Sequence, residues 1–213
     1  MGVRTMDTTL RVLTGAGLLG LVMAGFLAIL VTEARAESPT AAMRGTIDQV
    51  LVVLGDASLQ APERAGERRE MLEALVRERF DHEEMGKRTL GKRQWEILDD
   101  VQRKEFVDLF QRLLSKTYAG NVDNYSGEQV EYIGERRKGN FAEVQTAVFS
   151  NDVELAIHYR LLKHAETWKV YDVVIDGISL VKNFRGQFER IIKAESLDGL
   201  FETLRNKLAR SSS

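Results

Sequence analysis

The chain has no cysteine and only three histidines among its 213 residues, and these scarcities exclude several kinds of chemistry. Without cysteine there are no disulfides, no thiolate nucleophiles and no cysteine-ligated metals. His82, His158 and His164 are scattered, and none stands at a ligand spacing from another histidine or a carboxylate. The sequence therefore predicts no metal site, and its stability must come from side-chain packing.

Motifs for nucleophilic and phosphate chemistry are also missing. Ser179 lies in the run GISL, residues 177–180, which lacks the G-x-S-x-G pattern of a hydrolase nucleophile. Residues 86–89, GKRT, end like a phosphate-binding loop, but Asp81 stands where that loop requires its upstream glycine. We therefore expect no catalytic residue and interpret the chain as a binding protein.

Residues 1–36 have the layout of a secretory signal peptide. Arg4 and Arg11 precede an uncharged apolar run over 12–31, and Ala34 and Ala36 supply the small residues of a cleavage site. The run is also long enough to span a hydrocarbon core of about 30 Å as a helix, so an uncleaved amino-terminal anchor is the alternative. Its four glycines favour cleavage after Ala36. Both interpretations send the chain across a membrane, which in a bacterium leads to the periplasm.

The remaining residues, 37–213, are predicted to form a single domain. They carry 27 basic and 30 acidic side chains, a mildly acidic balance. Such a balance does not indicate the basic face that nucleic-acid binding requires. It also argues against permanent adsorption to anionic lipid surfaces.

Apolar side chains spaced three and four residues apart predict helices over 43–54, 67–80, 84–90, 100–119, 184–192 and 197–208. Asp81 with Glu84 and Asp99 with Gln102 are capping-box patterns that begin the third and fourth of these helices. Trp95 lies between those two helices, in a segment that we expect to be a short turn.

From Gly127 the apolar period changes from 3.6 to 2, which predicts strands over 129–134, 141–149, 153–162 and 168–175. Short turns join them, including a hairpin at Gly139 and Asn140, so the strands form an antiparallel meander. Helices, then strands, then helices indicate an α+β domain. We expect a curved four-stranded antiparallel sheet covered by several helices.

Two acidic residues interrupt the apolar strand 168–175 and its turn. Asp172 and Asp176 stand four positions apart, which places them on one face of an extended strand. A carboxylate inside a cavity of such a domain is able to act as a general base on a hydrophobic ligand. We favour instead a structural ion pair between Asp172 and Arg185, which would hold the following helix against the sheet.

Aromatic side chains are more numerous than one face of a four-stranded sheet needs: Phe106, Phe110, Tyr118, Tyr125, Tyr132, Tyr159, Trp168 and Phe184. A packed core explains most of them. The sharper interpretation is that the sheet and the helices are held apart around a cavity that a lipid tail fills.

Several motifs occur in a fixed order along the chain. They are FD at 80–81, LG at 90–91, Trp95, QRKEF at 102–106, Phe110, Leu114, Tyr118, Tyr125, GE at 127–128, Tyr159, WKVYDV at 168–173, GISL at 177–180 and NFRGQF at 183–188. In these motifs the chain resembles the MlaC family, also called the toluene-tolerance auxiliary family. The resemblance spans nearly all of residues 37–213.

The resemblance implies a monomeric periplasmic carrier that binds phospholipid as cargo and uses no cofactor. Such a carrier exchanges lipid with an inner-membrane ABC transporter complex and with an outer-membrane lipoprotein–porin complex, and so maintains the lipid asymmetry of the outer membrane. A sister branch lies beside hopanoid genes, so a hopanoid or another amphiphile is an alternative cargo. A small enzyme that uses Asp172 or Asp176 as its base is the other alternative.

The apolar faces and the resemblance together predict the residues that contact lipid tails between sheet and helices: Phe106, Phe110, Leu114, Tyr118, Tyr125, Tyr132, Val144, Val148, Leu155, Ile157, Tyr159, Trp168 and Val170. A charged side chain at Val170 or Ile157 is expected to reduce bound lipid more than it reduces folding.

Overall fold

The computed structural model describes residues 37–123, 125–150 and 153–210. The predicted signal peptide, residues 1–36, lies outside this described part of the chain. Within the described part, no helix combines the length and the apolar character that crossing a membrane requires.

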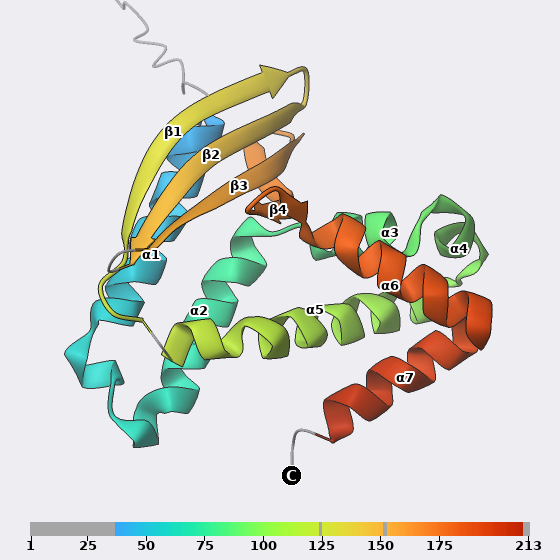
Figure 1. Ribbon diagram of the computed structural model, residues 1–213. Helices are drawn as coiled ribbons and strands as arrows, with labels where there is room; N and C mark the ends of the chain where they lie inside the picture. The colour runs from blue at the N-terminus through green and yellow to red at the C-terminus, as the bar shows by residue number, and fades with distance from the viewer. Residues whose placement is uncertain (1–36, 124, 151–152, 211–213) are drawn as a thin grey trace, which may run out of the picture. The chain divides into compact units, whose positions relative to one another are not determined.

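A five-stranded antiparallel sheet forms the β part of the domain (Figure 1). Its strands follow one another in chain order: β1 Gln129–Lys138, β2 Phe141–Ser150, β3 Val153–His164, β4 Thr167–Ile175 and β5 Ile178–Ser179. The four predicted strands and the α+β class are confirmed. The two-residue β5 is an addition that the sequence pattern did not predict, because so short a strand shows no period.

Turns and bulges give the sheet its curvature. Gly139, with φ +58°, makes the predicted β1–β2 hairpin, since only glycine enters this backbone region without strain. The register shifts once between Tyr132 and Gly134 and once between Arg160 and Leu161. Each shift inserts an extra residue on one strand, which bends the sheet and increases its twist.

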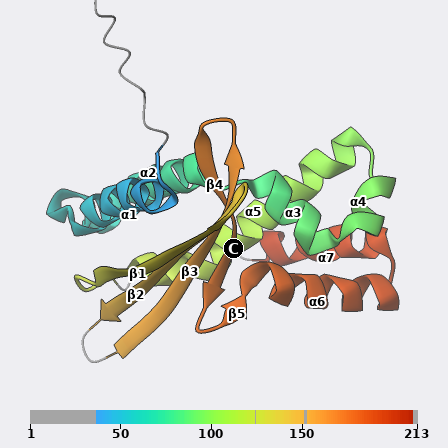
Figure 2. The same cartoon turned by 90° about the horizontal axis from the view of Figure 1, so that it is seen from above.

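The described residues form seven α-helices: α1 Pro39–Gly55, α2 Ala65–Arg79, α3 His82–Leu90, α4 Lys92–Ile97, α5 Asp100–Asp123, α6 Leu180–Ala194 and α7 Leu197–Ala209. Two short 3₁₀ turns, Ala57–Leu59 and Pro62–Arg64, connect α1 to α2. Figure 2 shows α1 and α2 together along one side of the sheet, with α6 following β5. The turn expected at Trp95 is in fact the one-and-a-half-turn helix α4.

Side-chain caps set the beginnings of α3 and α5 as the sequence predicted. Asp99 Oδ1 accepts from the Gln102 backbone N–H at 2.8 Å, and Gln102 Oε1 accepts from the Asp99 N–H at 3.1 Å, which completes a reciprocal capping box. At α3 only half of the box forms. Asp81 Oδ1 accepts from the Glu84 N–H at 2.9 Å, whereas the Glu84 side chain pairs with Arg88.

The apolar core is divided into three clusters. One joins α1 to the inner face of the sheet through Ala42, Met43, Val144, Leu161, Trp168 and Val170. A second, rich in phenylalanine, lies among α3, α4, α5, α6 and α7. A third holds the α1–α2 pair together around Val53, Leu54, Leu59 and Leu72. Helix α1 thus covers the inner face of the sheet, and β4 also contacts α2, α3 and α6.

Candidate functional site

A cavity of about 350 Å³ lies where α2 and α5 meet strands β3 and β4. This volume falls within the roughly 300–1,000 Å³ that is usual for small-molecule sites. Segments far apart in the sequence supply its walls: Arg69, Leu72, Glu73, Val76, Phe80, His82, Met85, Gln111, Arg112, Leu114, Ser115, Tyr118, Ile157, Tyr159, Val173, Ile175 and Leu180.

The sheet contributes one wall through two cross-strand pairs. Ile157 on β3 is paired with Ile175 on β4, and Tyr159 is paired with Val173. Residues two apart on a strand share a face, so all four side chains point to the same side of the sheet. Ile157, Tyr159 and Ile175 also pack against the core cluster beneath α1. The cavity is therefore a continuation of the core into a region that α1 does not fill.

The long helix α5 contributes the opposite wall with the later part of its apolar row. Leu114 and Tyr118 lie one turn apart and line the cavity with Gln111 and Ser115. Phe106 and Phe110, earlier in the same row, pack against Phe184, Phe188 and Phe201. The helix thus separates the cavity from the phenylalanine-rich core.

Polar side chains at the cavity come mainly from α2 and α5. Ser115 Oγ donates to Glu73 Oε1 at 2.5 Å, which links the two helices across the cavity wall. Arg69 and Arg112 are exposed to solvent. The cavity therefore has a charged side that faces water and an apolar wall formed by the sheet.

Burial favours the neutral form of three titratable groups that line the cavity, His82, Tyr118 and Tyr159. Burial lowers the pKa of His82 from its usual 6.5, and the positive charge of Arg77 lowers it further, while Asp81 opposes the shift. Burial also raises the pKa of Tyr118 and of Tyr159. All three shifts favour the uncharged form of the side chain, which suits an apolar ligand.

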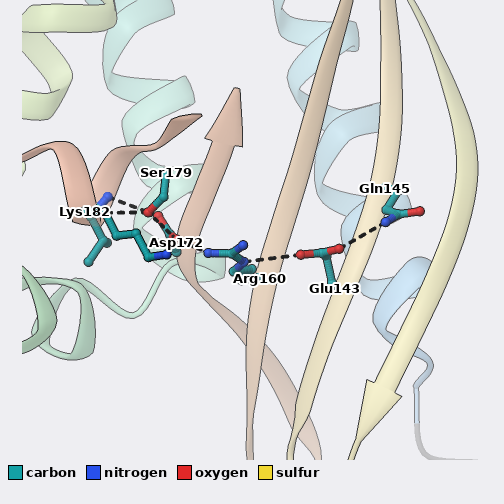
Figure 3. A network of polar contacts seen from close by, with 7 residues as sticks. Glu143, Gln145, Arg160, Asp172, Ser179 and Lys182 are labelled. Carbon is teal, nitrogen blue, oxygen red and sulfur yellow. Dashed lines mark hydrogen bonds and ion pairs between the residues drawn. The ribbon is translucent and has the colours of Figure 1, made fainter. Parts of the chain in front are cut away.

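Asp172 is part of a buried polar network that lies outside this cavity (Figure 3). Its side chain is only 3% exposed. Oδ2 accepts from Arg160 Nη1 at 3.0 Å and from Ser179 Oγ at 2.7 Å, and Oδ1 accepts from the Val181 N–H at 3.1 Å. Ser179 in turn caps α6 by accepting from the Lys182 N–H at 3.1 Å. The carboxylate fastens the start of α6 to β4.

The structure corrects the predicted partner of Asp172. Its cation is Arg160 on the neighbouring strand β3, which also bonds Glu143 at 3.2 Å. Arg185 pairs instead with Glu189 on its own helix, at 2.9 Å. Asp172 still holds α6 against the sheet, but it does so by accepting hydrogen bonds from the Ser179 hydroxyl and the Val181 N–H.

Neither acidic residue of the general-base alternative lines the cavity. Asp176 lies in the exposed turn after β4 with φ +46°, where its Oδ1 accepts from the Ala156 N–H at 3.2 Å. Asp172 and Asp176 therefore do not share a face, because β4 ends at Ile175. Among the described residues there is also no group of three or more histidine, aspartate or glutamate side chains able to hold a metal ion.

Four of the predicted lipid-contacting residues are brought together at the cavity: Leu114, Tyr118, Ile157 and Tyr159. The structure places the others elsewhere. Phe106 and Phe110 lie in the helical core, and Val144, Trp168 and Val170 lie fully buried in the cluster beneath α1.

The remaining predicted positions also fall outside the cavity lining. Tyr132 packs against the cluster beneath α1, with the Arg44 guanidinium 3.9 Å from its ring centre. Tyr125 packs beside the α1–α2 cluster. Val148 and Leu155 are half-buried and face each other across β2 and β3. Their apolar character reflects packing between elements rather than the cavity.

Sequence reasoning missed the contribution of α2 and of the segment after it. Leu72, Val76, Phe80, His82 and Met85 line the cavity, although the helix was predicted only to bury its apolar side. One signal of the cavity wall was present on β4. Val173 and Ile175 stand two residues apart, as Ile157 and Tyr159 do on β3, so each pair marks one face of its strand. No sequence signal indicates that α2 helps to enclose a cavity beside the sheet.

The fold and the cavity together define an α+β domain with an apolar cavity between its sheet and its helices. Residues 44–206 match the MlaC protein family. The chain belongs to the MlaC family, and the resemblance of its motifs is confirmed.

Two known proteins add to this assignment. The intermembrane phospholipid transport system binding protein MlaC of Haemophilus influenzae is 26% identical over 118 residues, which are 53% of each chain. The match thus spans about half the length of this curated relative. A solved structure of the phospholipid-binding protein from Ralstonia solanacearum, in complex with a phospholipid, matches with a TM-score of 0.72 and 27% identity. That match covers 84% of this chain and 99% of the other.

Proposed function

We propose that this protein is a carrier of phospholipid. The acyl tails of the bound lipid occupy the cavity between α2, α5 and the sheet. The observation that carries the proposal is the cavity itself, with its apolar wall of Ile157, Val173 and Ile175 and its uncharged Tyr118 and His82. The phospholipid held by the similar Ralstonia solanacearum protein supports the same cargo.

The energetics of lipid transfer explain why such a cavity suffices. Exposing a tail to water costs about 0.8 kcal/mol per CH₂, so a tail of about 16 carbons costs roughly 13 kcal/mol. An apolar cavity recovers most of this free energy without any chemical step. Transfer stays reversible because the cavity and the bilayer offer the tail similar surroundings. The protein therefore acts as a carrier and not as an enzyme, and phospholipid is its cargo rather than a cofactor.

The proposal extends to the place where the protein works. Residues 1–36 direct export and are cleaved after Ala36, which releases a periplasmic monomer. This monomer exchanges phospholipid with an inner-membrane ABC transporter complex and with an outer-membrane lipoprotein–porin complex. The exchange maintains the lipid asymmetry of the outer membrane. The transport role in the name of the Haemophilus influenzae relative supports this assignment.

The test is to express the whole chain in a Gram-negative host and to purify it from the periplasmic fraction. Amino-terminal sequencing is expected to begin at Glu37. Mass spectrometry of an organic extract is expected to find phospholipid in a near-stoichiometric ratio to protein. Protein that is repeatedly free of phospholipid would overturn the proposed cargo, and a polycyclic lipid in the extract would replace it with a hopanoid-like one.

A vesicle assay then tests transfer itself. The purified protein is expected to accelerate the movement of fluorescent phospholipid from donor to acceptor vesicles, in proportion to its concentration. If the protein retains phospholipid but transfer is no faster than without it, the carrier role is refuted while lipid binding stands.

A further inference from the structure

Two adjoining grooves lie where α6 passes the α3–α4 junction, away from the residues that line the lipid cavity. The first has a volume of about 570 Å³ and runs between the start of α4, at Lys92, and residues 185–193 of α6. The second has a volume of about 690 Å³ and lies between α3, α4 and the start of α6. Gly91, Lys92 and Arg185 belong to both. We call this pair the basic grooves.

The basic grooves concentrate positive charge on an otherwise acidic protein. They are lined by nine of the 27 basic side chains that follow residue 36, but by only three of the 30 acidic ones. The rest of the domain is left with 18 basic and 27 acidic side chains. Such segregation produces a local positive potential that a mildly acidic whole-chain balance conceals.

The three carboxylates in the grooves are already engaged. Asp172 is buried and bonded to Arg160, Glu189 accepts from Arg185, and Glu96 lies 3.7 Å from Lys92. Several of the cations are not engaged in this way. Within the described residues, no carboxylate lies within ion-pair distance of four exposed groove cations: Arg93, Lys182, Arg190 and Lys193.

Arg185 stands at the junction of the two grooves, and the backbone there makes room for it. Gly91 has φ +84°. A methyl group at this position would approach Arg185 Nη2 to 3.3 Å. The guanidinium therefore lies against the bare backbone of residue 91, with its side chain 51% exposed. Phe184 and Phe188, its neighbours in the NFRGQF motif, are buried in the core and hold this part of α6 in place.

We propose that the basic grooves are a docking site for an acidic peptide segment of a partner protein. Clusters of arginine and lysine recognise carboxylates by charge-assisted hydrogen bonds and favour encounter with acidic partners. The concave shape decides between a peptide and a membrane. A bilayer surface is broad and flat and cannot enter two grooves, whereas a protruding acidic segment presents its carboxylates along them. This inference rests on that part of the proposed function in which the carrier meets protein partners.

The proposal is tested with a fluorescein-labelled poly-glutamate peptide and the purified chain, by fluorescence anisotropy. In the groove variant, Arg93→Gln, Arg190→Gln and Lys193→Gln remove three exposed cations that have no carboxylate partner in the described residues. The control variant removes the same charge from exposed positions elsewhere, through Lys104→Gln, Arg136→Gln and Lys138→Gln. A further variant, Arg185→Gln, tests the junction of the grooves.

The groove variant is expected to bind the peptide about tenfold more weakly than wild type, because each neutralised contact contributes a fraction of a kcal/mol to binding. The control variant is expected to bind within about twofold of wild type, and Arg185→Gln to fall between them. Raising the ionic strength is expected to weaken wild-type binding, since the contacts are exposed. Vesicles of phosphatidylglycerol and phosphatidylethanolamine are expected to bind wild type and control equally poorly.

Three outcomes would overturn the docking site: no peptide binding by wild type, equal losses in groove and control variants, or groove-dependent binding to the vesicles but not to the peptide. Lipid content and thermal unfolding are measured on the same samples, and the groove variant is expected to keep both. A wild type without lipid that still binds the peptide through the grooves would refute the lipid cargo and leave the docking site standing.

Discussion

Two hydrophobic-to-charged substitutions, at Ile157 and at Val170, distinguish a residue that lines the lipid cavity from a residue of the core. The sequence predicted the same outcome for both positions: a greater loss of bound lipid than of folding. The structure now distinguishes them. Ile157 lines the cavity and is half-buried, whereas Val170 is 0% exposed and packs in the cluster beneath α1. The backbone carbonyl of Val170 also accepts from the Asp81 N–H at 2.8 Å, which ties β4 to the start of α3.

For Ile157→Glu we expect loss of lipid with modest loss of stability. In the lipid-free protein the new carboxylate faces the cavity, where water can hydrate it. When a lipid tail enters, the carboxylate loses its hydrating water and the tail lacks its contact with the isoleucine side chain. Together these two losses weaken lipid binding by about 3 kcal/mol. Affinity for lipid therefore falls roughly a hundredfold. The free energy of unfolding of the delipidated protein falls by only about 1 kcal/mol, or roughly 3 °C in melting temperature.

For Val170→Glu we expect the reverse. An unpaired charge in a fully buried site costs at least about 4 kcal/mol, which lowers the melting temperature by roughly 12 °C. Whatever fraction still folds is expected to bind lipid, because Val170 does not line the cavity. Only at Ile157 is lipid loss then expected to exceed the loss of folding.

The assay combines two measurements on each variant: phospholipid per folded protein by mass spectrometry, and thermal unfolding of delipidated samples by circular dichroism. Val153→Glu is the matched control, since it places the same charge on the same strand at a position that is 63% exposed. The reasoning is refuted if Ile157→Glu retains as much lipid as Val153→Glu, or if it unfolds as readily as Val170→Glu.

Three further changes test the supporting structure. Asp172→Asn leaves Arg160 without its buried carboxylate partner, so the free energy of unfolding in urea is expected to fall by about 3 kcal/mol. A fall of less than about 1 kcal/mol would contradict a stabilising role of this network. Because burial depresses the pKa of His82 in the folded protein, the unfolded chain takes up its proton first as pH falls through 6.5. Stability should therefore decline below pH 6.5 in wild type, and this part of the decline should be absent in His82→Gln; identical pH curves would count against a buried neutral imidazole. The Tyr132 hydroxyl is buried without a hydrogen-bond partner among the described residues. Tyr132→Phe is therefore expected to raise the free energy of unfolding by about 1 kcal/mol. A fall in the free energy of unfolding would show that the hydroxyl has a partner.

The helix α5 shows how far sequence periodicity reaches. Phe106, Phe110, Leu114 and Tyr118 are spaced four residues apart, which places them in one apolar row along the helix. Each step turns about 40° further around a helix of 3.6 residues per turn, so the row winds from the phenylalanine-rich core at Phe106 and Phe110 to the cavity at Leu114 and Tyr118. Periodicity identifies the row but not the neighbour that each part of it meets, because that neighbour comes from a distant part of the chain.

Asp172 gives the same lesson for an ion pair. Short sequence separation made Arg185 the expected partner, but the antiparallel register of β3 and β4 brings Arg160 directly opposite. Beyond β4, Asp176 turns away because its φ of +46° ends the strand. Register and turn geometry, rather than spacing along the chain, decided which cation the carboxylate meets.

Most of the helices and strands of this protein could be predicted from its sequence alone. Its apolar periods, caps and turns predicted the helices and the antiparallel meander, and its ordered motifs predicted the MlaC family. The periods, caps and turns are local signals, since each depends on residues within a few turns of one another. The tertiary structure alone decided where the cavity opens and where the basic grooves lie. Both features are formed by segments that are separated in sequence by tens of residues, and only the packing of α2, α5, α6 and the sheet determines which faces touch and which stand apart.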